Sequence, residues 1–576
     1  MKQTIRRSYE FVISHRKIEF VLLILFAIYW ANTFHTNFPD EFDNIVGGWY
    51  INQGRIPYVG FFSHHNPGSY YIASLITLLT KQSFVAFRSI WAIVLFGTGL
   101  GGYLYLRFSL GAKRIDFYLP YLFALGLGAT YFWAHMLLSE TVVGYLLVPA
   151  YALVVLRTLF SEKFTRSDII FISLTTSFAL YTSLIFIYAV IVLLGLFAYR
   201  YISQENIRKE KRRFFKNFLV TLIIFIIPYL IFILHLLITG SWSEFIFQSI
   251  SYNRDYYIYN FPVVAGKIST NPARFALSIF YNTTLQFHSL LVQVRNFNFS
   301  YPVNITLLLG NTALLIYLLS KRKMSLSVAI YLFLVYLNAR SEPLNSQETD
   351  FHSTVYFMVS LFNMCWILKE LFYSLSTKIS DSWRYVYKII FTTLAIYAFF
   401  FVLFLTRTFG EKVYAKIMGH APAIYDAPVV APIVNKIVSR NEYFWIGPFE
   451  FQELLYINGK LPSKYHWFLP ASARSEKIKN ELTRDLHKNK PKLIVFKEDY
   501  RAFGTEAKDF NPTIVDILRN DYFRLEDLEA EGKRFKPKII NLHNFNIATN
   551  FYFDKSRKEE IIELLLREEI IEPNPS

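Results

Sequence analysis

The sequence predicts an all-α polytopic membrane domain of about eleven transmembrane helices, followed by a small α/β soluble domain. Of the 576 residues, 53% are hydrophobic and only 18% are charged, a balance far from that of a soluble domain. The apolar residues gather in blocks of about 20, each long enough as a helix to cross a hydrocarbon core of about 30 Å. After residue 409 the pattern changes to short apolar segments that alternate with charged ones. We therefore place a transmembrane domain at residues 1–409 and a separate domain at residues 410–576.

The first apolar block follows the basic stretch 6–17, and no small-residue cleavage site comes after it. This pattern favours a retained signal anchor over a cleaved signal peptide. Ten further blocks follow, of which the fifth and sixth spans are short. The spans are expected near residues 18–35, 88–107, 117–136, 141–160, 168–182, 183–200, 217–238, 302–320, 324–338, 355–373 and 386–406.

Lys and Arg gather on one side of these spans, which the positive-inside rule assigns to the cytoplasm. The basic clusters of this side are residues 6–17, 113–114, 163–166, 208–216, 321–323 and 378–388. An odd number of spans then places the tail on the outer face, together with the loops 36–87, 239–301 and 339–354. The net charge of +17 partly reflects this bias, and no nucleic-acid motif is visible, so we expect no nucleic-acid partner.

The tail pattern predicts a small α/β domain. Residues 443–446 and 493–496 are expected as buried strands, and the helical periodicity of residues 472–488 between them predicts a strand-helix-strand unit. Residues 561–567 would form a closing helix. The tail contains no glycine-rich nucleotide fingerprint, no P-loop and no Cys/His zinc spacing, so nucleotide or zinc binding is not expected.

The densest polar chemistry follows the first span, where Asp40, Glu41 and Asp43 precede His64 and His65. If Pro39 starts a helix, Asp40 and Asp43 share one face and Glu41 points away, so two of the three carboxylates converge easily. The simpler explanation is that acidic residues favour the positive end of a helix dipole. The density of Gly, Pro, Tyr and His in this loop favours a functional site.

This loop resembles the first outer loop of the GT-C class of polyprenyl-phosphate-sugar glycosyltransferases, to which protein O-mannosyltransferases and lipid A aminoarabinose transferases belong. The matching features are Asp40-Glu41, a helix to Gly54, Ile-Pro-Tyr at 56–58 and His-Asn-Pro-Gly-Ser-Tyr at 65–70. The similarity extends to Ser139-Glu140-Thr141, to the short fifth and sixth spans, to His352 and to tail residues 443–447 and 455–465.

The resemblance implies a transferase that moves a sugar from a polyprenyl-phosphate carrier to an acceptor hydroxyl, with inversion at the anomeric carbon. Asp40 matches the first acidic position of the class and would be the general base. Glu41 would orient it or bind the sugar. Cations must hold the phosphate, and we favour Arg340 with His352, then Arg254, although each also suits a solvated loop charge or an interface anchor.

Three further residues are candidates for substrate binding besides Asp43. Glu140 lies in an apolar hairpin without Lys or Arg in the turn, so it either needs a polar partner in a pocket or is a simple polar tip. His64 and His65 with Asp40 or Asp43 offer a divalent-metal alternative, but their spacing matches no closed zinc pattern and structural hydrogen bonding is favoured. We therefore assign no certain cofactor and no metal ligands.

The expected location is a bacterial cytoplasmic membrane, with the N-terminus in the cytoplasm and the tail outside. The expected partners are the bilayer, the lipid-linked sugar donor and an acceptor that is a glycan, a lipid or a protein. A lipid-linked saccharide flippase and an inactive scaffold of the same fold are the alternatives. Ion-coupled transporters bury ionisable residues near the midplane, whereas here acidic residues collect at the outer surface, which favours the transferase.

Overall fold

The chain folds into two compact units. The computed structural model describes residues 19–34, 38–204, 211–260, 271–293, 302–337, 351–377, 381–419, 428–530, 535–538, 541–542 and 545–573. The first unit comprises Met1–Asn37, Phe84–Phe232 and Val263–Ile424, and the second comprises Phe38–Ser83, Ile233–Pro262 and Tyr425–Ser576. The second unit therefore adds two segments to the predicted tail domain, which the sequence had grouped with the membrane domain.

Long apolar helices indicate a membrane protein. Six helices among the described residues are long and apolar enough to cross a bilayer: Phe84–Leu110, Ser139–Leu159, Leu184–Ser203, Phe218–Ile238, Phe351–Tyr373 and Thr392–Ile417. Shorter apolar helices cover Glu19–Ala31, Gly68–Thr80, Tyr118–Gly128, Leu307–Ser320 and Met324–Leu337. The membrane-type, mostly helical class is thus confirmed, and the full count of eleven spans stays a prediction.

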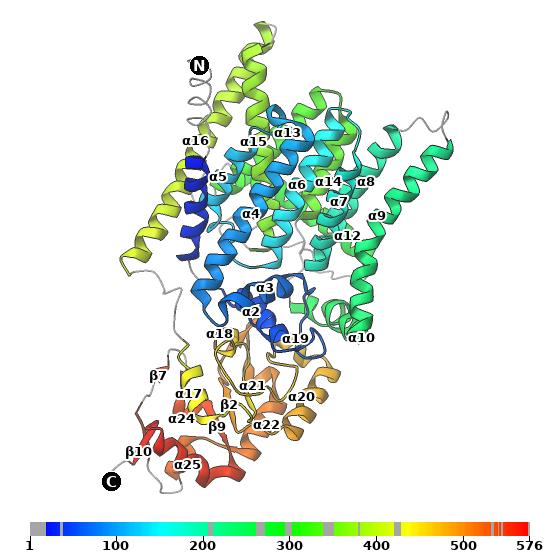
Figure 1. The fold of residues 1–576 in the computed structure, drawn as a ribbon. Coiled ribbons are helices and arrows are strands. Elements are labelled where there is room, and N and C mark those ends of the chain that lie inside the picture. The colour runs from blue at the N-terminus through cyan, green and yellow to red at the C-terminus, as the bar shows by residue number, and fades with distance from the viewer. Residues whose placement is uncertain are drawn as a thin grey trace, which may run out of the picture. The chain divides into compact units, whose positions relative to one another are not determined.

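Helices α6 and α15 form the centre of the first unit. The apolar window of Ser139–Leu159 is 83% buried, whereas that of Phe218–Ile238 is only 11% buried. Helix α6 packs against α4, α7 and α15, and α15 packs against α5, α13 and α16 (Figure 1). Besides the helix Glu19–Ala31, the described residues of this unit form the helices α4 (Phe84–Leu110), α5 (Tyr118–Gly128), α6 (Ser139–Leu159), α7 (Arg166–Thr182), α8 (Ile187–Gln204), α9 (Lys211–Ile238, which continues into the second unit), α12 (Pro272–Gln293), α13 (Pro302–Ser320), α14 (Met324–Leu337), α15 (Thr354–Thr377) and α16 (Asp381–Ile417), with 3-10 turns η1 (Asn32–Phe34), η2 (Ala112–Arg114), η3 (Leu184–Phe186) and η7 (Phe351–Ser353).

A ladder of buried polar side chains ties α6, α13 and α15 together. The Tyr151 hydroxyl donates to Asn363 Oδ1 at 2.9 Å, and Asn363 Nδ2 donates to Asn311 Oδ1 at 3.0 Å. Asn311 Nδ2 then donates to Ser360 Oγ at 2.8 Å. Because no water competes inside an apolar bundle, such bonds fix the register of neighbouring helices.

The second unit is built around a close contact between α2 (Pro39–Asn52) and α3 (Gly68–Thr80). Helix α2 begins at Pro39, as the sequence predicts. A Cβ atom at Gly48 would lie 2.5 Å from the Ala73 Cβ and 2.5 Å from the Ser74 nitrogen, so the two backbones can meet only at a residue without a side chain. At the end of α2, Asn52 Nδ2 donates to the Ser74 carbonyl at 2.9 Å.

The tail contains the predicted strand-helix-strand unit. Strands β1 (Phe444–Gly447) and β2 (Leu493–Phe496) pair in parallel, and α20 (Glu476–Lys488) connects them. The sheet order is β1-β2-β9-β5, with β9 (Phe551–Asp554) and β5 (Tyr522–Phe523) antiparallel, and the predicted closing helix is α25 (Lys558–Arg567).

Short elements complete the second unit. The helices and turns are α10 (Trp242–Phe245), η4 (Ile246–Ser251), α11 (Tyr252–Asp255), η5 (Tyr257–Asn260), α17 (Ala431–Ile437), α18 (Phe451–Leu454), α19 (Pro470–Ala473), α21 (Ala507–Phe510), α22 (Pro512–Asp521), α23 (Leu525–Ala530), α24 (Ile547–Asn550) and η8 (Lys555–Arg557). The strands are β3 (Arg501–Ala502), β4 (Thr505–Glu506), β6 (Phe535–Pro537), β7 (Asn541–Leu542), β8 (Phe545–Asn546) and β10 (Ile571–Pro573). Among these, α18 packs directly on α2.

The helix contact at Gly48 yields a stability prediction. Gly48→Ala should destabilise the protein by about 1–3 kcal/mol, because the added methyl group forces α2 and α3 apart. Gly97→Ala is the matched control, since a Cβ atom there, in helix α4, meets nothing within 4 Å. Thermal unfolding of the purified protein in detergent measures both. An unchanged melting temperature for Gly48→Ala would contradict the close contact.

Candidate functional site

The three carboxylates at the start of α2 differ in burial. Asp40 is partly exposed, Asp43 is buried, and Glu41 is completely buried. The sequence placed Glu41 on the face away from the other two, and in the structure this side chain is fully covered. Asp40 is therefore the carboxylate of this group that is most open to a substrate.

Asp43 is held by a tyrosine from α3. The Tyr70 hydroxyl donates to Asp43 Oδ2 at 2.7 Å, and Ser63 Oγ lies 2.6 Å from the same hydroxyl oxygen. Gly47 makes this arrangement possible, because a Cβ atom there would lie 2.4 Å from Cδ1 of the Tyr70 ring. The backbone nitrogen of Ser63 in turn donates to Gln248 Oε1 at 3.0 Å. The acidic helix, the histidine loop and the segment around Gln248 are thereby connected.

His466 brings the tail to the same carboxylate. Its ring is buried, and Nε2 lies 3.9 Å from Asp43 Oδ1. Nδ1 lies 3.2 Å from the carbonyl oxygen of Lys464, a contact that needs the proton on Nδ1. The sequence analysis missed His466, because only the tertiary fold brings residue 466 to residue 43.

A second group of the tail, Glu450, adjoins the helix that packs on α2. It is the residue directly before that helix, α18. Burial and the charge of Glu453 raise the pKa of Glu450 to about 8, while Lys497 opposes the rise. Burial and the charges of Glu450 and Asp40 also raise the pKa of Tyr500, so these three groups share one local field. No motif in the sequence marks Glu450, which the sequence analysis also missed.

The two predicted histidines lie in an aromatic cluster. The His64 ring centre is 3.9 Å from that of His65 and 4.4 Å from that of Tyr257. The His65 carbonyl accepts a hydrogen bond from the Tyr58 hydroxyl at 2.9 Å. Within the described parts of the chain, no three His, Cys, Asp or Glu side chains are grouped closely enough to hold a metal ion.

Glu244 joins the 233–262 segment to the tail. Lys477 Nζ lies 2.8 Å from Oε1, and Lys464 Nζ and Gln248 Nε2 lie 2.9 Å and 3.0 Å from Oε2. Burial opposes ionisation, but these donors prevail and lower the pKa of Glu244 to about 2. The carboxylate stays ionised throughout the physiological range and keeps this segment on the tail.

The remaining predicted residues that the structure describes divide between the two units. Arg254 is exposed, and its Nε and Nη2 donate to the neighbouring Asp255 at 2.6 Å each, which suits a solvated loop charge. Glu140 and His352 are buried in the first unit, where Glu140 accepts a bond from Ser139 Oγ at 2.8 Å. Arg340 lies outside the described residues. A substrate-binding role for these residues stays a prediction.

The fold and the site together define a class of protein: a multi-helix, membrane-type chain with a carboxylate site formed by one loop and its tail. A scan against protein-family models and a search of curated proteins find no match to this chain. The case for function therefore depends on the residues of the site itself.

The raised pKa of Glu450 predicts how the stability of the protein depends on pH. Because the pKa of Glu450 is raised to about 8, its protonated form contributes stability that is complete below its ordinary pKa and lost as the pH rises through about 8. We expect the melting temperature of the wild type to fall between about pH 5 and pH 8 more steeply than that of Glu450→Gln.

The matched control for this measurement is Glu476→Gln, which changes an exposed carboxylate of the tail. Thermal unfolding in detergent at several pH values should give the wild-type slope for this variant. Identical slopes for the wild type and Glu450→Gln would contradict the raised pKa.

Proposed function

We propose that the protein is a glycosyltransferase of the GT-C kind, which moves a sugar from a polyprenyl-phosphate carrier to an acceptor hydroxyl. The observation that carries the proposal is the assembly of one carboxylate site from the acidic start of α2 and the tail. Asp43 Oδ1 lies 3.9 Å from His466 Nε2, and the charges of Asp40 and Glu450 both act on Tyr500. The resemblance of residues 38–70 to the first outer loop of that class supplies the reaction type.

Asp40 is the proposed general base. In the reaction the acceptor oxygen forms a bond to the anomeric carbon while the bond from that carbon to the carrier phosphate oxygen breaks. The phosphate keeps the bonding electrons, and the proton of the acceptor hydroxyl passes to Asp40. Partial exposure at the start of α2 supports this role, since Glu41 and Asp43 are both buried.

The other carboxyl groups have supporting roles in this proposal. Complete burial favours an orienting role for Glu41 over contact with the sugar. The hydrogen bond from Tyr70 fixes the position of the Asp43 carboxylate beside His466. Glu450, with a pKa of about 8, keeps its proton near neutral pH and can donate a hydrogen bond to a sugar or phosphate oxygen.

The membrane arrangement is part of the proposal. Eleven spans, a cytoplasmic N-terminus and an outer tail place the site where a carrier head group of a bacterial cytoplasmic membrane lies. Arg340, His352 and Arg254 remain the proposed groups for the carrier phosphate. The sugar and its acceptor, whether glycan, lipid or protein, are left to the assay.

The test is transfer from labelled polyprenyl-phosphate sugars to an envelope fraction by the purified protein. Asp40→Asn should lower the rate by about 10²–10⁴, because the acceptor proton loses its base. Asp509→Asn is the control, since Asp509 is an exposed carboxylate of the same unit. Equal transfer by the wild type and Asp40→Asn would remove Asp40 from its role. Movement of the lipid across vesicles without transfer would instead indicate the flippase.

A further inference from the structure

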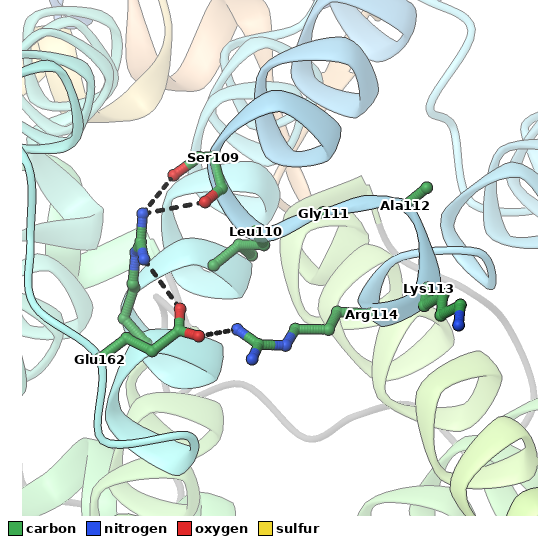
Figure 2. A pocket seen from close by; sticks show the side chains of 8 residues that line it. Ser109, Leu110, Gly111, Ala112, Lys113, Arg114 and Glu162 are labelled. Carbon is green, nitrogen blue, oxygen red and sulfur yellow. Dashed lines mark hydrogen bonds and ion pairs between the residues drawn. The ribbon is translucent and has the colours of Figure 1, made fainter.

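A pocket of about 430 Å³ opens where two apolar helices of the first unit end. It is formed by the last residues of α4, the turn 111–114, Arg157 in the last turn of α6 and Glu162 just beyond that helix. Figure 2 shows Lys113 and Arg114 on the turn and Glu162 opposite them. Both helices are long and apolar enough to cross a bilayer, so the pocket lies at the boundary between apolar and aqueous surroundings.

Arg157 is the buried cation of this pocket. Its side chain is only 10% exposed. Nη1 donates to Glu162 at 2.8 Å, and Nη2 donates to Asp168 at 3.0 Å and to the Ser109 carbonyl at 3.0 Å. Its Nε is also buried but has no hydrogen-bond partner among the described residues. A buried guanidinium N–H without a partner is costly, which points to a missing acceptor.

Glu162 is shared by two arginines from different elements. Arg114 donates to Oε1 and Arg157 to Oε2, so two guanidinium groups converge on one carboxylate (Figure 2). The Glu162 side chain is 26% exposed, so solvent and solutes reach it. Proteins bind phosphate with the same arrangement, in which two cationic side chains surround one accessible oxyanion.

Charge neutralisation within the protein accounts for part of this cluster. Asp168, fully buried at the start of α7, requires the Arg157 charge, and the two form an ion pair. Lys113 is exposed on the pocket rim and forms no ion pair among the described residues. The cations Lys113, Arg114 and Arg157 outnumber the carboxylates of Glu162 and Asp168, which leaves an excess of positive charge around the pocket.

We infer that this pocket binds a phosphate-bearing anion, and that Glu162 occupies part of the site when the anion is absent. Two sources share this chemistry. The head group of an anionic phospholipid lies at this depth of a membrane, and a soluble phosphate compound reaches the pocket from the aqueous side. The inference uses none of the residues of the proposed transfer site and stands or falls separately from it.

The test compares three variants of the full-length protein in detergent. Lys113→Gln removes a rim cation without disturbing packing, and Glu162→Gln removes the internal competitor. Arg166→Gln is the control, because Arg166 is an exposed cation at the start of α7 that does not line the pocket. The probes are phosphatidylglycerol, counted as bound lipid by native mass spectrometry, and inorganic phosphate, followed by thermal shift against chloride of equal ionic strength.

Lys113→Gln should weaken binding about fivefold, Glu162→Gln should strengthen it by a similar factor, and Arg166→Gln should leave it unchanged. If phosphatidylglycerol shows this pattern, the site binds a lipid head group. If inorganic phosphate shows it, the site binds a soluble phosphate compound. If Glu162→Gln fails to fold, the comparison of binding by Lys113→Gln and Arg166→Gln still tests the inference. Equal binding of both probes by the wild type, Lys113→Gln and Arg166→Gln would overturn the inference.

Discussion

The contact of α2 with α3 at Gly47 and Gly48 is the constraint on which the site depends. Gly48 lets the helix backbones meet, and Gly47 leaves room for the Tyr70 ring. Tyr70 can then donate to Asp43, and α2 also packs against α18 from the tail. A methyl group at either glycine would move the carboxylates relative to the tail groups that face them. The position of the acidic residues thus follows from two residues without side chains.

Two carboxyl groups of the second unit, Glu244 and Glu450, show how neighbouring groups decide whether a buried carboxyl is ionised. Burial acts on both Glu244 and Glu450. At Glu244, hydrogen bonds from two lysines and a glutamine prevail and lower the pKa to about 2. At Glu450 the nearest strong influence is another carboxylate, Glu453, so burial is reinforced and the pKa rises to about 8. The first group holds the unit together as an ion, and the second offers a proton near neutral pH.

Local signals in the sequence predict much of the fold. Pro39 marks the start of α2, and the apolar segments 444–447 and 493–496 with an amphipathic stretch between them give the parallel strand pair. The long apolar blocks indicate the membrane class for the same reason, since each is a property of neighbouring residues.

Contacts between distant segments could not be predicted in this way. The packing of residues 38–83 and 233–262 with the tail, and the approach of His466 to Asp43, join positions hundreds of residues apart. The sequence analysis therefore identified Asp40, Glu41 and Asp43 but neither of the tail groups beside them. The burial of Glu41 likewise depends on what covers its face of α2, which the helical spacing alone does not determine.

The central claim is that the acidic start of α2 and the tail occupy one compartment outside the membrane. Single cysteines at the exposed positions Gln53 and Asp509 test it most directly, with Cys365 replaced by serine and a control cysteine at the exposed Arg166, on the side proposed as cytoplasmic. In intact cells a membrane-impermeant maleimide should modify the cysteines at 53 and 509, and the cysteine at 166 only after permeabilisation. Modification of positions 53 and 509 from opposite sides of the membrane would contradict the account.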